Sequence, residues 1–161
     1  MKSLGFVGKN IISGWQTNGI LTVQSGQPYS VVAGVDNSLT GIGLDRAQIV
    51  GNPSLPSSRP TGQKVSEWFN TSAFAFSPLG TYGDSPHDFL AGPSFADFDF
   101  SLVKSIQIRE SQHLDFRAES FNLFNNPNFG DPVANLSSSS NGQVQTAGSP
   151  RIIQFALKYY F

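Results

Sequence analysis

The chain has 161 residues and a formal net charge of −1 at pH 7, and charged residues make up 13% of it, about half the roughly 25% usual in soluble domains. This near-neutral balance gives no electrostatic basis for binding nucleic acid or an anionic membrane surface. Cysteine is absent, which excludes disulfides, thiolate chemistry and zinc–cysteine sites. The 14 Phe residues among abundant Gly, Ser, Asn and Thr favour a β-protein with long polar loops.

The sequence offers no helical route into a membrane. Residues 1–9 contain no apolar stretch long enough for the core of a signal peptide. No window approaches the roughly 18 consecutive apolar residues of a transmembrane helix. A membrane location would therefore require β-strands, and we expect this chain to be the terminal part of a longer protein that carries the export signal upstream.

The first predicted strand covers residues 11–24, in which Ile11, Trp15, Leu21 and Val23 share one face. Its alternation is imperfect, as is typical of barrel strands. Residues 25–94 follow as a predicted long loop, rich in Pro, Gly, Ser and Asn. Its short apolar runs at 29–32, 68–69 and 74–76 are expected to form brief strands or to pack the loop onto itself. So long a connection is improbable inside a compact soluble domain and ordinary on the outer side of a membrane barrel.

The second and third predicted strands, residues 95–108 and 112–124, both place apolar side chains at even-numbered positions. Directly opposed residues of an antiparallel pair project to the same face, so paired residue numbers must sum to an even number. This predicts a three-residue turn at 109–111 and pairs such as Ile106 with Leu114 and Ser101 with Glu119. Lys104 interrupts the apolar face, and we expect its ammonium to reach the interface along its apolar stem.

The fourth predicted strand covers residues 151–161 and follows a second loop at 125–150. Alternating directions place both long loops at one end of the sheet and the short turn at the other, as in outer-membrane barrels. The fold class is therefore all-β, an antiparallel meander of about four long strands from a transmembrane β-barrel with long extracellular loops. The positions expected to face lipid are Phe98, Phe100, Leu102, Leu114, Phe116, Ile153, Phe155, Leu157, Tyr159 and Phe161.

The dense charge group of the sequence falls on the opposite face of the same strands. We expect it to line the barrel lumen and to contact substrate or plug, or to serve as ordinary polar lining paired across strands; its members are Asp97, Asp99, Asp115, Arg117 and Glu119. The spacing of Asp84, His87 and Asp88 could hold a metal ion, but we expect a loop histidine among solvated carboxylates. We predict no metal and no cofactor. We expect no enzymatic activity. The alternatives left open are a hydrolase using the acidic group and a soluble secreted β-sandwich that binds carbohydrate through its aromatic loop.

Several stretches resemble the C-terminal part of Oar-like TonB-dependent outer-membrane receptors. They are Gly14-Trp15-Gln16, Gln24 to Pro28, Trp68-Phe69-Asn70, Gly92 to Phe95, Asp99 to Lys104, Phe116 to Asn125 with Pro127 to Gly130, and the aromatic terminal strand. The stretch from Phe116 to Asn125 is the most specific.

The resemblance implies a larger protein with a carboxypeptidase regulatory-like domain, a plug and a barrel of about 22 strands. This chain, residues 1–161, would be the C-terminal barrel segment. Its implied partners are the remaining strands and plug, TonB and outer-membrane lipid. Its implied location is the outer membrane of a Gram-negative bacterium, and the implied activity of the full-length family is energy-coupled uptake of a substrate. The chain lacks the plug and most strands of that pattern.

Overall fold

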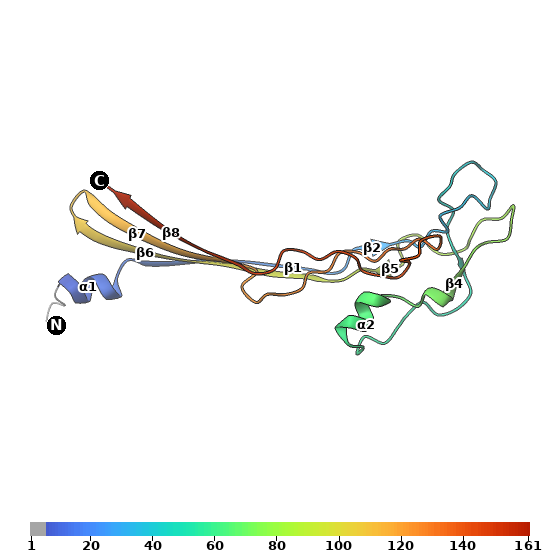
Figure 1. The fold of residues 1–161 in the computed structure, drawn as a ribbon, viewed down its shortest axis with the longest axis horizontal. Coiled ribbons are helices and arrows are strands. Elements are labelled where there is room, and N and C mark those ends of the chain that lie inside the picture. Colours follow the sequence, from blue (N-terminus) through green and yellow to red (C-terminus); the bar gives the residue numbers. More distant parts are fainter. Residues whose placement is uncertain (1–5) are drawn as a thin grey trace. The chain divides into compact units, whose positions relative to one another are not determined.

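The computed structural model describes residues 6–161, which divide into two compact units. Unit 1 comprises the chain up to Val23 with 96–127 and 149–161, and unit 2 comprises 24–95 and 128–148. The elements, in chain order, are the helix α1 (Phe6–Ile12), strands β1 (Trp15–Gln24), β2 (Pro28–Tyr29) and β3 (Gln48–Ile49), the helix α2 (Thr61–Ser66), the 3₁₀ helix η1 (Thr71–Ala73), and strands β4 (Phe74–Ala75), β5 (Leu90–Ala91), β6 (Phe95–Arg109), β7 (Gln112–Phe121) and β8 (Ile152–Tyr160) (Figure 1).

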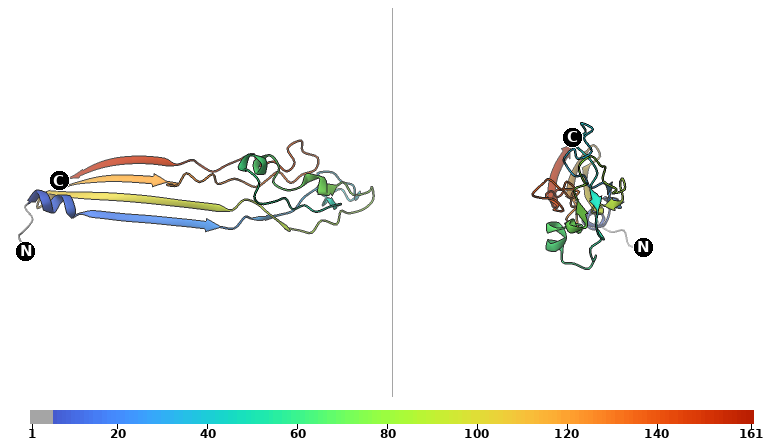
Figure 2. Two further views of the ribbon diagram at one scale, coloured as in Figure 1. Left: turned by 90° about the horizontal axis from the view of Figure 1, so that it is seen from below. Right: turned by 90° about the vertical axis from the view of Figure 1, so that its right-hand side faces the viewer.

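The four long strands form one antiparallel sheet in the order β1-β6-β7-β8 (Figure 2). This confirms the predicted meander of four long strands. Consecutive strands are neighbours, so the strand ends that lead into both long connections lie at one end of the sheet, as predicted. Among the described residues of unit 1, no second sheet packs on this one.

The first strand starts later than predicted because residues 6–12 are helical and a turn at Gly14 separates them from β1. Gly14 has a φ of +78°, and a Cβ added to it would lie 2.3 Å from the carbonyl oxygen of Ser105. Only glycine permits both the left-handed backbone and so close an approach of two main chains. Ile11 therefore belongs to α1 and not to the strand.

The third strand ends three residues earlier than predicted, at Phe121. Asn122 takes a left-handed φ of 50°, which Asn tolerates better than most residues. Its backbone N–H donates to the Asp99 carboxylate at 3.0 Å, and its side-chain oxygen accepts from Asn126 N–H at 2.8 Å. These bonds replace the strand ladder with a turn.

The predicted register between the second and third strands is present, but the predicted three-residue turn is wrong. Ile106 pairs with Leu114 and Ser101 pairs with Glu119. The turn itself has two residues, Glu110 and Ser111, because Arg109 pairs with Gln112. A register shift between Gln107 and Arg109 supplies the missing residue. A β-bulge of this kind changes the pairing parity locally and leaves the faces of the long strands matched.

Unit 2 shows that the predicted loop of residues 25–94 is folded. Its core contains Val31, Ala47, Phe69, Ala73 and Phe74, and the Phe69 and Phe74 rings meet edge to face at 5.6 Å. Two small antiparallel sheets, β2 with β5 and β3 with β4, hold the segments in place. The apolar runs at 29–32, 68–69 and 74–76 therefore supply brief strands and core side chains, as expected.

The second long connection belongs to the same unit. Val32 N–H donates to Ala134 O at 2.9 Å, and Val144 N–H donates to Val65 O at 2.9 Å. Burying backbone groups requires partners of this kind.

Over residues 6–161, none of the helices has the length and hydropathy needed to cross a membrane.

Candidate functional site: the polar face of the four-stranded sheet

The register sorts the side chains of the four strands onto two chemically different faces. Leu114 pairs with Tyr159 and Phe116 pairs with Leu157, whereas Asp115 pairs with Lys158 and Glu119 pairs with Gln154. On β1, Trp15 shares the apolar face, because the Lys104 ammonium lies 4.9 Å from its ring centroid. Since directly opposed residues project to one side, most apolar side chains gather on one face and most charged ones on the other, with Lys104 an exception on the apolar face.

The charged face brings together the residues predicted to line a lumen. Asp97 and Asp99 alternate along β6, and Asp115, Arg117 and Glu119 alternate along β7. All five therefore lie on the same side of the sheet.

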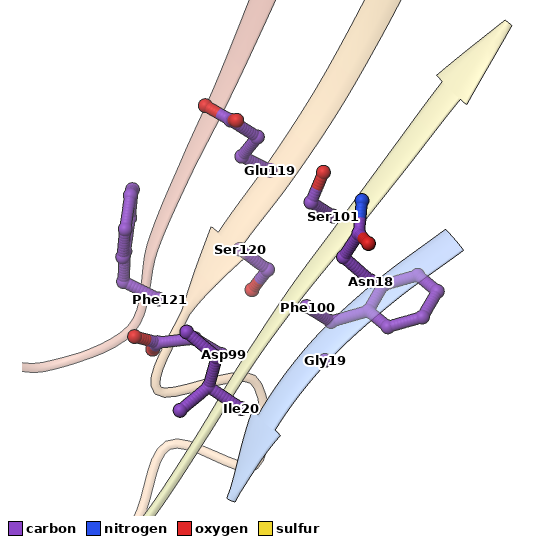
Figure 3. Close-up of a pocket in the computed structure, with 9 residues that line it drawn as sticks. All are labelled: Asn18, Gly19, Ile20, Asp99, Phe100, Ser101, Glu119, Ser120 and Phe121. Atoms are coloured by element: carbon purple, nitrogen blue, oxygen red, sulfur yellow. The ribbon is translucent and has the colours of Figure 1, made fainter. Parts of the chain in front are cut away.

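A hollow of about 190 Å³ lies across β1, β6 and β7 at this part of the sheet (Figure 3). Asp99, Ser101 and Glu119 line it together with Asn18 and Ile20 of β1. Asn18 is not among the predicted site residues, because a lone Asn in an imperfectly alternating strand carries no distinctive pattern. Phe100 and Phe121 add apolar lining, so the hollow combines two carboxylates and neutral polar groups with a largely apolar wall.

The carboxylates of this face are held by neighbouring strands. Ser105 Oγ donates to Asp115 at 2.6 Å, and Gln154 Nε2 donates to Glu119 at 2.6 Å. The Arg117 guanidinium lies 4.0 Å from Glu119. Such cross-strand contacts are expected of an ordinary polar lining. They also hold the carboxylates in fixed positions, as a binding site for substrate or plug would require. Gln154 and Ser105 are contributors that the sequence pattern did not single out.

The opposite face exposes large apolar side chains. Phe155 is 69% exposed, Leu157 67% and Phe161 94%. The Phe116 and Phe155 rings stack at 6.0 Å across β7 and β8. Phe98, Phe100, Leu102 and Leu114 are half-buried, and the Phe98 ring stacks on Phe124 at 5.5 Å. An apolar surface as extensive as this marks contact with lipid or with another protein.

Lys104 has a role that the sequence pattern did not reveal. The residue is 7% exposed, and its ammonium donates to the carbonyl oxygens of Asn10 and Ser13, with Ile11 O at 3.5 Å. A cation at the C-terminal end of a helix satisfies carbonyls that lack intrahelical partners. The expectation that Lys104 extends freely to the interface is therefore replaced by a specific contact with the end of α1.

The histidine spacing that resembled a metal site does not assemble one. His87 Nδ1 lies 2.9 Å from the Asp88 carboxylate, and both side chains are exposed. Asp84 instead accepts from Ile49 N–H at 2.8 Å. Within residues 6–161, no group of three or more His, Asp or Glu side chains is arranged to hold a metal ion.

Comparison with protein families gives a match. The model of the outer membrane beta barrel domain matches residues 2–154, which include β1, β6, β7 and the first residues of β8. Comparisons with curated proteins and with solved structures gave no match.

Proposed function

The chain belongs to the outer membrane beta barrel domain family, and we propose that it is the C-terminal barrel segment of an Oar-like TonB-dependent receptor. In this proposal the full-length protein takes up a substrate across the outer membrane of a Gram-negative bacterium with energy supplied through TonB, and the chain is not an enzyme. Family membership already implies an outer-membrane location. The observation that carries the proposal is the sorting of one sheet into an exposed apolar face and a charged face by a continuous register.

The two edges of the sheet indicate what partners are needed. Within the described chain, β1 and β8 each pair on one side only. In hydrocarbon an open edge leaves backbone groups unsatisfied at a cost of several kcal/mol each. Further barrel strands would cover these edges, and a plug would contact the charged face. Because β1 and β8 run in opposite directions, an antiparallel barrel closes with an even number of additional strands.

A labelling experiment tests the barrel part of the proposal. The chain has no cysteine, so single cysteines at Gln154, Phe155, Ala156 and Leu157 each report one position. In phospholipid vesicles, a bilayer-embedded quencher should reach probes at 155 and 157, and a water-soluble maleimide should react at 154 and 156. Equal reactivity at all four positions would contradict the assignment of the faces.

A second experiment tests the receptor part. Uptake by the receptor that carries this chain should stop in cells lacking TonB, while the amount of folded barrel in the outer membrane stays unchanged. Uptake that persists without TonB would leave a passive barrel as the function. Glu119→Gln addresses the hydrolase alternative, because a hydrolase would lose turnover and a polar lining would lose none.

A further inference from the structure

Unit 2 contains a hollow with an aromatic wall. Trp68, Phe69 and Phe89 line it together with Tyr29 and Leu55, and its volume is about 270 Å³. An adjoining hollow of about 220 Å³ shares Leu55 and Trp68 and adds two cationic side chains, those of Arg59 and Lys64. Trp68 therefore lies between an aromatic compartment and a basic one.

The Trp68 side chain is fixed before any ligand arrives. Its indole N–H donates to Ala91 O at 2.9 Å, and its backbone N–H donates to Gly142 O at 2.7 Å. The next residue, Phe69, is buried in the core and packs against the rings of Phe74 and Tyr29. A preorganised aromatic wall reduces the entropy that a ligand must overcome on binding.

Tyr29 adds a polar group that lacks a partner. Its hydroxyl is buried and forms no hydrogen bond with any described residue. Burial, and secondarily the charge of Asp131, raises the pKa of this hydroxyl, so it remains an O–H donor at neutral pH. A buried donor without an acceptor is costly. Tyr29 lines the aromatic hollow, so a small shift of its side chain would let a ligand oxygen accept from this hydroxyl.

The basic compartment favours a negative charge. The Arg59 guanidinium donates to the carbonyl oxygens of Pro56, Glu67 and Trp68 at 2.8–3.3 Å. Among the described residues, neither Arg59 nor Lys64 forms an ion pair. The Glu67 carboxylate accepts from the Thr71 hydroxyl at 3.2 Å. Two cations without a paired carboxylate attract an anionic group.

We propose that these joined hollows bind an acidic saccharide, with a sugar ring stacked on Trp68, a ring oxygen accepting from Tyr29 and a carboxylate beside Lys64. A saccharide fits because it combines an apolar ring face with many hydroxyls, which matches aromatic walls interrupted by a few polar groups. This inference rests on the proposed function and names the substrate class that the receptor takes.

Binding of tetragalacturonate to the full chain in phospholipid vesicles tests the inference. The chain has two tryptophans, Trp15 and Trp68, so a Trp15→Phe background makes Trp68 the sole fluorophore. We expect saturable quenching by tetragalacturonate that weakens with salt. Neutral maltotetraose should bind at least tenfold more weakly, and inorganic sulfate at equal ionic strength should cause no saturable change.

Matched variants assign the contacts. Lys64→Gln should weaken tetragalacturonate binding about tenfold and erase the preference over maltotetraose. Tyr29→Phe, which keeps the ring and its packing, should weaken binding of both sugars. Lys158→Gln removes an equal charge from β8 and should change neither affinity.

The outcomes separate this inference from the proposed function. Absence of tetragalacturonate binding, or equal affinity for both sugars, would overturn the saccharide site even when the alternating labelling of residues 154–157 is intact. Loss of that alternation would instead overturn the barrel assignment itself.

Discussion

A single pair of arginine substitutions distinguishes a lipid-facing surface from a polar one at nearly the same depth. Phe155 and Gln154 are neighbours near the middle of β8, yet they point to opposite faces. Phe155→Arg would place a guanidinium in hydrocarbon, which costs about 2–4 kcal/mol at the bilayer midplane. Loss of the ring pair with Phe116, seen at 6.0 Å, adds about 0.5–1.5 kcal/mol. The expected destabilisation is therefore about 2.5–5.5 kcal/mol.

Gln154→Arg is the matched control. Gln154 lies opposite Glu119 and donates to it at 2.6 Å. The new guanidinium would replace one hydrogen bond to the carboxylate with another of similar strength, about 1.5–3 kcal/mol for a bond to a charged group. The net change should stay within about 1 kcal/mol.

Urea unfolding of the chain in phospholipid vesicles, followed by circular dichroism, measures both variants. Phe155→Leu keeps an apolar side chain at the same place and separates the loss of the ring pair from the insertion of charge. Equal destabilisation by the two arginines, or a larger cost at residue 154, would refute the assignment of the faces.

Three further outcomes follow from particular contacts. Lys104→Met removes the ammonium from the end of α1 and should destabilise the packing of α1 by about 1–3 kcal/mol. The fluorescence of Trp15, whose ring faces this ammonium, should shift in Lys104→Met and should not shift in Lys158→Met. Phe69→Ala empties the centre of the unit 2 core and should cost about 3–5 kcal/mol in unit 2, measured by hydrogen exchange of its amides while those of the long strands keep their protection. Asp36 has a lowered pKa: desolvation would raise it, but hydrogen bonds from Gly41, Thr40, Ser38 and Leu39 together outweigh that effect. The ionised Asp36 therefore stabilises this turn fully above the ordinary pKa of 3.8, and the stabilisation is lost as the pH falls through the lower folded pKa. The Gly41 amide resonance should shift as the pH falls below 3.8. An Asp36→Asn variant should show no such shift.

The long strands could be predicted because one physical constraint acts on every second residue. The contrast between Phe155 and Gln154, or between Phe116 and Arg117, repeats over each strand and fixes both its face and its register. The strand ends could not be predicted in the same way. The strands end at Gly14 and Asn122 because these residues adopt left-handed backbone conformations. The alternation of the neighbouring side chains does not mark these positions in the sequence.

The fold of unit 2 was beyond local reasoning for a different reason. Its apolar runs could be recognised, but their partners lie far away along the chain. Val32 bonds with Ala134 and Leu136, and Trp68 bonds with Gly142. No spacing within residues 25–94 indicates that a second connection completes the core. The acidic group of the sheet was predictable as a set, whereas Gln154 and Ser105, which hold its carboxylates, carry no signal before the register is known.

The composition of unit 2 has a consequence for the order in which the chain folds. Its core and hydrogen bonds draw on residues 25–94, which connect β1 to β6, and on residues 128–148, which connect β7 to β8. Contacts such as Val32 with Ala134 join residues far apart in sequence, so forming them first would require closing a very long loop. Pairing of the four strands brings all the ends of both connections to one end of the sheet and shortens that closure. We therefore infer that unit 2 acquires its core after the sheet has paired, and that loss of β8 pairing would destabilise unit 2 although none of its core residues had changed.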